Sequence, residues 1–98
     1  VVVRVPVGAG SEADGSTLTE LQLDIEPGFH VLAIQRGGRY VYRPRGHVRL
    51  DAGDELIASG PDEGHPILAA RCGWHLTEND DTGQHTLEAL QTRSGATR

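Results

Sequence analysis

The chain has 98 residues, with 9 basic and 14 acidic side chains, and its formal net charge is −5 at pH 7. This surplus of carboxylates argues against a nucleic-acid partner, because phosphate binding needs basic residues gathered on one face. A domain of this length buries only about 60–65% of the surface of its unfolded chain, so we expect it to gain stability from a partner subunit.

The ends and the apolar content of the chain indicate an excised domain from the cytoplasm. The sequence does not begin with Met, has no signal-like start, and has no apolar run near the roughly 18 residues of a membrane span. We therefore expect no direct membrane insertion. The single cysteine, Cys72, has no partner for an internal disulfide, which fits a reducing compartment.

The first elements predicted along the chain are a strand and a short helix. Residues 1–7 are β-branched and apolar, which indicates a strand, and Pro6 favours a position at the edge of a sheet. Thr17 and Glu20 have the spacing of a capping box, in which each side chain satisfies a backbone N–H at a helix start. We therefore expect a helix over about 18–23.

A β-hairpin is predicted next. Residues 29–34 carry an unbroken apolar core at 31–34, which indicates a strand buried on both faces. Gly37 and Gly38 then supply the positive φ values of a type I′ turn into a second strand over 39–43. Pro44 cannot donate to a sheet, so it marks a bend after this hairpin.

The next segment predicts an extended stretch, a turn and a strand. Residues 47–50 alternate between polar and apolar side chains, and residues 55–59 (ELIAS) indicate another strand that ends at Gly60. Between them, Gly53 permits a tight turn. Asp54 should accept hydrogen bonds from backbone N–H groups and thereby fix the entry to the strand, so we assign both residues a structural role.

A helix should follow, and a polar tail after it. Pro61 and the two carboxylates after it suit a first helical turn, and the helix should present Ile67, Leu68 and Cys72 to the sheet and end near Gly73. Residues 1–75 are thus the predicted domain. Residues 76–98 are polar and are predicted to be a mobile tail.

A glycine-rich loop follows the first predicted strand. Gly8, Gly10 and Ala13 match the G-x-G-x-x-G/A fingerprint of dinucleotide-binding loops. The following helix starts late and is short, and no strand-ending acidic residue lies about 20 positions on. An ordinary turn is the simpler interpretation.

Two patterns could in principle hold a metal. Cys72, His75, Asp80 and His85 are possible ligands, but their spacing repeats no known closed site, and a core-facing Cys with solvated histidines explains them as well. Residues 42–65 superficially resemble half of a cupin barrel, yet the chain has no His-x-His with a downstream Glu. We expect no metal, and the absence of a Ser/His/Asp or Cys/His set at useful spacing argues against an enzyme.

Arginines cluster around the predicted hairpin, within fourteen residues of a negatively charged chain. They could clamp phosphate groups through bidentate hydrogen bonds. Alternatively, they line the solvent face of a strand and pair with nearby carboxylates. The cluster comprises Arg36, Arg39, Arg43, Arg45 and Arg49.

The ordered combination of these elements resembles a known family. The segments STLTEL, GFHVLAIQRGG and LDAGDELIASG, with Pro44 between the last two, resemble the C-terminal domain of TrkA-type potassium-uptake regulators, also called the RCK C-terminal domain. The resemblance covers about residues 1–73. It implies a small α+β sandwich of order β-α-β-β-β-α that dimerises and regulates potassium channels and transporters. Some archaeal relatives join this domain to a PhoU-like helical domain.

The resemblance also implies a ligand site. In several relatives cyclic di-AMP lies across the dimer axis, against the strand that follows the first helix and against the segment that carries the proline. Ligand-binding relatives commonly have small or polar residues where Phe29 and His30 stand, so we expect Phe29 to fill part of the cleft. The positions carried over to this chain are Phe29, His30, Val31, Leu32, Ala33 and Pro44, with Arg43 and Arg45 nearby.

Two hypotheses about function remain. One is a ligand-sensing, homodimeric regulatory domain of a potassium transport system, which would act on a membrane transport protein or a PhoU-like domain and would need no cofactor besides a regulatory nucleotide. The other is a plain dimerisation module without a ligand.

Overall fold

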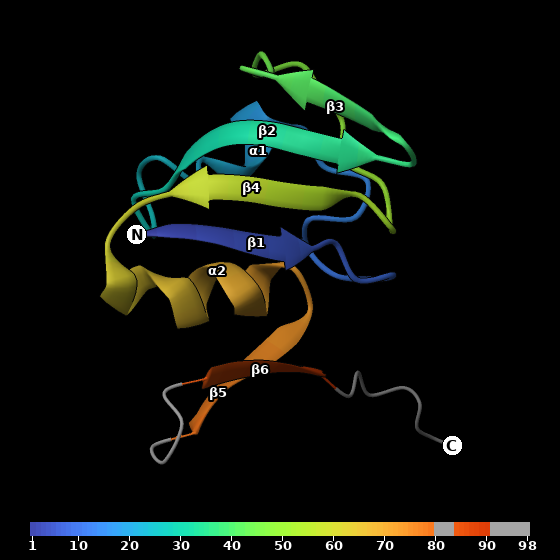
Figure 1. The fold of residues 1–98 in the computed structure, drawn as a ribbon. Coiled ribbons are helices and arrows are strands. Elements are labelled where there is room, and N and C mark those ends of the chain that lie inside the picture. The colour runs from blue at the N-terminus through green and yellow to red at the C-terminus, as the bar shows by residue number, and fades with distance from the viewer. Residues whose placement is uncertain (80–83, 91–98) are drawn as a thin grey trace.

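A computed structural model describes residues 1–79 and 84–90. The chain forms a β-α-β-β-β-α unit followed by a separate hairpin (Figure 1), so the predicted α+β fold and its order are confirmed. The elements are β1 (Val2–Pro6), α1 (Leu18–Leu21), β2 (His30–Arg36), β3 (Arg39–Tyr42), β4 (Glu55–Ser59), the 3₁₀ turn η1 (Asp62–Gly64), α2 (His65–Arg71), β5 (Trp74–Asn79) and β6 (Gln84–Ala89).

Four strands form one antiparallel sheet in the order β1-β4-β2-β3. β1 lies at an edge, as the proline near its end predicted. Val5, Leu56 and Ile34 are opposite one another on three neighbouring strands, and all three are 0% exposed. These side chains form the centre of the core, which the helices complete.

The helix α2 covers part of the core and follows β1 along the sheet (Figure 1). Leu68 and Cys72 are buried, but Ile67 is 44% exposed, so the prediction that Ile67 faces the sheet is wrong. The helix begins at His65, because η1 takes up residues 62–64. Leu68 and Cys72 are four residues apart and share the buried face, whereas Ile67 lies outside that face. Neither described helix is long and apolar enough to cross a membrane.

Phe29 packs into the core beside two glycines. Its side chain is 1% exposed, and a Cβ atom on Gly60 would approach the ring to 2.7 Å. A Cβ atom on Gly64 would approach it to 3.0 Å. These two glycines let the end of β4 and the start of α2 close over the ring, so the side chain points away from solvent.

An ion pair joins β2 to the turn before β4. Arg36 Nε donates to Oδ1 of Asp54 at 2.9 Å, and Arg36 Nη2 donates to Oδ2 at 2.7 Å. The backbone N–H of Asp51 donates to the same Oδ2 at 2.8 Å, and Gly53 adopts a φ of +94° within this turn. Arg36 also donates to the carbonyl oxygen of Arg49 at 2.8 Å. The turn, β2 and the preceding loop are therefore tied together.

The turn of the central hairpin differs from its prediction. Gly37 has a φ of +60°, while Gly38 does not have a positive φ. The hairpin turn is therefore not type I′: it has the positive φ at its first position only, which is the type II′ pattern and also fits the twist of the strands. Residues 47–50, which were predicted to be extended, form no strand of the sheet. Among them only Arg49 forms an isolated β-bridge, and its partner is Thr17.

A hairpin occupies part of the predicted tail. β5 and β6 pair in antiparallel register, with Leu76 opposite Leu87, so residues 76–79 and 84–89 of the predicted tail form strands. The indole Nε1 of Trp74 donates to the carbonyl oxygen of Pro6 at 2.6 Å and anchors the hairpin to the end of β1. Residues 80–83 and 91–98 of the predicted tail lie outside the described residues.

Replacing Asp54 by Asn should destabilise the fold and change its response to acid. The hydrogen bonds from Arg36 hold the pKa of the Asp54 carboxyl below its ordinary value. The carboxylate therefore contributes stability that is fully present above the unfolded pKa of about 3.9 and is lost as the pH falls through the lower folded pKa. We expect Asp54→Asn to lower the free energy of unfolding at pH 7 by about 2 kcal/mol, the range for a hydrogen bond to a charged group.

Chemical denaturation of both proteins between pH 2 and pH 7 measures this difference. The gap between wild type and variant should narrow as the pH falls below about 3.9. Asp62→Asn is the control, since this exposed side chain has no partner in the described part of the chain. A gap that stays constant over the whole range would contradict the role assigned to Asp54.

Candidate ligand-binding site

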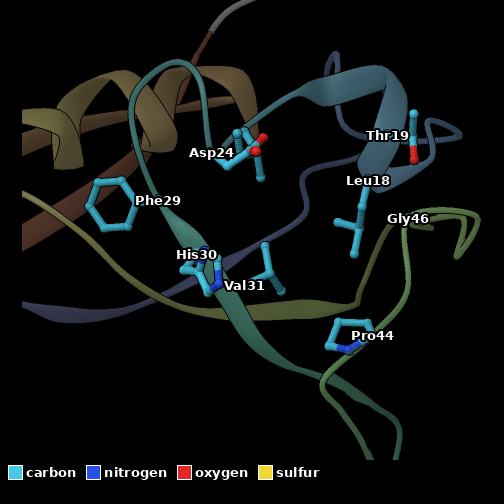
Figure 2. A pocket seen from close by; sticks show the side chains of 9 residues that line it. Leu18, Thr19, Asp24, Phe29, His30, Val31, Pro44 and Gly46 are labelled. Carbon is cyan, nitrogen blue, oxygen red and sulfur yellow. The ribbon is translucent and has the colours of Figure 1, made fainter.

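Two adjoining pockets lie at the start of β2, where the strand leaves the turn after α1. Their volumes are about 280 Å³ and about 550 Å³. Both are lined by His30, Val31 and Pro44, so they form one continuous cleft around the beginning of the strand. Figure 2 shows the smaller pocket, with side chains from α1, from β2 and from the loop after β3 around it.

The first helical turn of α1 and the loop after β3 form the walls of the smaller pocket. The predicted capping box is present: the backbone N–H of Thr17 donates to Glu20 at 2.8 Å, and the backbone N–H of Glu20 donates to the Thr17 hydroxyl at 3.1 Å. The backbone N–H of Thr19 donates to the carbonyl oxygen of Gly46 at 2.9 Å, which ties α1 to the loop. A Cβ atom at position 46 would collide with the Thr19 hydroxyl, so a larger residue here would require the Thr19 side chain to rotate away.

A bulge in β2 shapes the larger pocket. The register against β4 shifts between Val31 and Ala33, which leaves Leu32 out of the ladder. The backbone N–H of Arg43 donates to the carbonyl oxygen of Leu32 at 3.0 Å, and Arg43 adopts a φ of +50°. Leu32 is 40% exposed and Tyr42 is 72% exposed, so the wall of this pocket is apolar and open to solvent.

Most of the predicted ligand residues meet at this cleft. Ala33 is buried and lines neither pocket, and Arg45 is exposed and lines neither. Phe29 contributes only to the back of the smaller pocket, and Figure 2 shows its ring directed away from Leu18 and Pro44. The ring packs against Gly60 and Gly64, so it lines the smaller pocket and leaves it open. The predicted residues that line the cleft are Phe29, His30, Val31, Leu32, Arg43 and Pro44.

Several lining residues were not predicted from the sequence. The capping box predicted α1, but nothing local to α1 indicates that its first turn contacts the loop after β3. Tyr42 could have been predicted from the sequence as a binding residue, since it is an aromatic residue at the end of a predicted strand. In the structure its ring stacks on Tyr40 with centroids 5.6 Å apart. The residues missed are Leu18, Thr19, Leu23, Asp24, Tyr42 and Gly46.

The arginine cluster divides into arginines with internal partners and free arginines. Arg36 is bound to Asp54, and Arg49 donates to the carbonyl oxygen of Gly15. Three others make no ion pair or side-chain hydrogen bond with the described part of the chain: Arg39, Arg43 and Arg45. Of these three, Arg43 lines the cleft, so its guanidinium is the group available to an anionic ligand there.

The glycine-rich loop is not arranged for a pyrophosphate. The backbone N–H of Gly8 donates to the carbonyl oxygen of Cys72 at 2.8 Å, and that of Ala13 donates to the carbonyl oxygen of Arg71 at 3.1 Å. These amides already hold the loop against the end of α2. The helix α1 also begins at Leu18, beyond the loop, so its first turn does not follow the glycines directly.

The described residues include no group of three metal-binding side chains. Of the four possible ligands, Asp80 and the side chain of His85 lie outside the described part. Cys72 is 1% exposed, and burial raises the pKa of its thiol to about 12. It therefore belongs to the core.

The sequence and the fold are similar to those of known proteins. The family model of the TrkA-C domain matches residues 2–65. The RCK_C domain dimer of S. agalactiae BusR in complex with c-di-AMP has a TM-score of 0.67 at 20% identity, over 72% of this chain and 93% of that chain. The RCK C domain of the potassium transport protein KtrA, also in complex with c-di-AMP, has a TM-score of 0.63 at 25% identity, over 70% and 79%. No curated protein sequence matches the chain.

A further structural neighbour corrects one prediction. S. agalactiae BusR in complex with its busAB-promoter DNA matches with a TM-score of 0.67 at 20% identity, over 72% of this chain but only 35% of that chain. The prediction that nucleic acid is excluded as a partner is therefore wrong for proteins that carry this fold. The net charge of −5 describes this domain alone, and it does not limit what other parts of a longer protein bind.

The Cys72 thiol should resist modification while the domain is folded. With a pKa of about 12, only about one thiol in ten thousand is ionised at pH 8, and the side chain is buried as well. We expect an Ellman's-reagent assay at pH 8 to show slow labelling without denaturant and complete, rapid labelling in 6 M guanidinium chloride. Fast labelling of the native domain, at the rate of free cysteine, would contradict the buried position.

Proposed function

Because the chain belongs to the TrkA-C domain family, we propose that it is a homodimeric regulatory domain of a potassium transport system, located in the cytoplasm and without catalytic activity. The family and the structural neighbours are regulatory RCK_C domains. One of these neighbours, KtrA, is described as a potassium transport protein. The regulated component would be a membrane transport protein or a PhoU-like domain in the same protein.

The convergence of separate segments on one cleft carries this proposal. His30, Val31 and Pro44 come from two parts of the chain and line both pockets. The same three positions are those that the family resemblance assigns to cyclic di-AMP. A regulatory nucleotide bound here would touch α1, β2 and the loop after β3 together.

The cleft offers a nucleotide three kinds of contact. The exposed ring of Tyr42 is a surface on which a base can stack. The guanidinium of Arg43 can form bidentate hydrogen bonds with a phosphate. The side chains of Val31 and Pro44 supply apolar cover between these groups.

The rim of the cleft also suits a second copy of the chain. Leu32 and Tyr42 are exposed apolar side chains beside each other at the edge of the sheet. His30 and Val31 pair with β4 on one side but have no partner in β3, whose pairing with β2 begins at Ala33. A two-fold axis near this edge would bury the apolar side chains and bring two clefts together.

Ligand binding across such an axis would regulate through the dimer. A nucleotide that contacts both copies binds only one of their relative arrangements, so it shifts the population toward that arrangement by its difference in affinity. The shift would be transmitted to whatever each copy is attached to.

A plain dimerisation module is the second candidate. The exposure of Leu32 and Tyr42 favours it, because the same side chains could be buried entirely by the partner and close the larger pocket. Both candidates predict a dimer, and only the first predicts a ligand.

The domain should be a dimer without any ligand. We expect analytical ultracentrifugation at micromolar concentration to give a dimer in both low and molar salt, since apolar contacts are not weakened by screening. Leu32→Asp should give a monomer, because a buried unpaired carboxylate opposes association. Val2→Asp is the control: Val2 is 63% exposed on β1, at the other edge of the sheet. A monomeric wild type would rule out both candidates in this form.

Cyclic di-AMP should bind to the dimer, and Arg43 should carry the phosphate contact. We expect Arg43→Gln to weaken binding in calorimetry by about 1.5–3 kcal/mol, the range for a hydrogen bond to a charged group. Arg45→Gln removes the same charge two residues away but outside the cleft, so its affinity should stay near that of wild type.

The outcome separates the two candidates. Absence of binding heat from a dimeric wild type, at ligand concentrations up to a millimolar, would exclude the ligand and leave the dimerisation module. Equal losses in Arg43→Gln and Arg45→Gln would instead contradict the placement of the phosphate.

A further inference from the structure

A separate groove lies on the other side of the α1 segment. It has a volume of about 320 Å³ and lies between the end of α1 with its following turn and the helix α2. It shares no lining residue with the two pockets at the start of β2. Its lining residues are Glu20, Leu21, Gln22, Ile25, Glu26, Ile67 and Arg71.

Two exposed isoleucines line this groove. Ile25, in the turn after α1, is 71% exposed, and Ile67, on α2, is 44% exposed. Leu21 between them is 2% exposed and belongs to the core. Exposure of large aliphatic side chains to water is unfavourable in free energy, and a binding partner that covers them would remove this cost.

The groove is held in shape by hydrogen bonds. Arg71 on α2 donates through Nη1 to the carbonyl oxygen of Glu26 at 3.0 Å, and through Nε to the carboxylate of Glu12 at 3.2 Å. The backbone N–H groups of Ile25 and Glu26 both donate to the carbonyl oxygen of Gln22, at 3.0 Å and 3.1 Å. The turn and the helix are thus fixed relative to each other, so a partner would meet a preformed surface.

The free charge at the groove is negative. The guanidinium of Arg71 is already neutralised by its ion pair with Glu12. The carboxylate of Glu26 has no ion-pair partner in the described residues, and hydrogen bonds from Thr17 lower the pKa of Glu20 and keep it ionised.

We propose that this groove binds a basic amphipathic segment of a partner polypeptide. An aliphatic side chain of that segment lies between Ile25 and Ile67, and its Lys or Arg side chains pair with the carboxylates of the rim. Charge complementarity selects this occupant: nucleic acid and anionic lipid would be repelled by the same carboxylates, and an acidic segment would be repelled as well. The groove shares no lining residue with the cleft, so the segment can bind while the cleft is empty.

A labelled model peptide tests this surface on the whole chain. The probe is a fluorescein-labelled peptide of about 14 residues, long enough to form a helix, with Leu on one face and Lys on the other. We expect fluorescence anisotropy to show binding that weakens with salt, and Ile67→Gln to weaken it about tenfold, as expected for losing a buried aliphatic contact. Glu26→Gln should weaken it about threefold and reduce its salt dependence.

Matched controls keep the result specific to the groove. Val2→Gln and Glu88→Gln replace an exposed aliphatic residue and an exposed carboxylate elsewhere, and both should bind the peptide as wild type does. Arg43→Gln should also bind it normally, which separates this surface from the nucleotide cleft. Failure of wild type to bind the basic peptide, equal binding of a peptide with Glu in place of Lys, or unchanged binding by Ile67→Gln would each overturn the proposal.

Discussion

The buried carboxylate of Asp54 is the constraint on which the arrangement of the sheet depends. It is 3% exposed, so it must be paired; Arg36 at the end of β2 supplies two hydrogen bonds and the backbone N–H of Asp51 supplies a third. The central strand β4 begins one residue later, at Glu55, and pairs with both β1 and β2. One bidentate contact therefore holds the turn, the hairpin strand and the central strand in a single register. The cleft lies at the opposite end of β2, beyond the bulge at Leu32, where the register against β4 has shifted.

The arginines that stabilise the fold differ from the arginine at the candidate site in their hydrogen-bond partners. Arg36 and Arg49 are used by Asp54 and by the carbonyl oxygen of Gly15, so they organise the fold and have little left to offer a ligand. Arg43 has no such partner in the described residues and lies in the cleft, next to the exposed ring of Tyr42. Of the five clustered arginines, only Arg43 lines the cleft. Two of the others bind internal partners, and the remaining two line neither pocket.

The short helix α1 separates two surfaces of different character. Its residues Leu18 and Thr19 line the nucleotide cleft, while Glu20 and Leu21 line the acidic groove beside α2. In a four-residue helix, adjacent side chains point in different directions, so one element serves both surfaces. The capping box at Thr17 holds this turn in place, since so short a helix is not stable alone.

The sequence by itself determined what depends on local hydrogen bonds and on strand or helix periodicity. It predicted the element order through α2, the capping box and the edge position of β1, and the family resemblance identified the residues of β2 and of the Pro44 segment that line the cleft, but not those from α1. Tertiary structure alone decided that Phe29 turns into the core, that Ile67 faces solvent and that α1 contacts the loop at Gly46. It also decided that β5 and β6 pair beside the domain. These features arise from contacts between residues distant in sequence. Local patterns do not distinguish between the possible directions of these side chains, and the packing of the whole chain selects one of them.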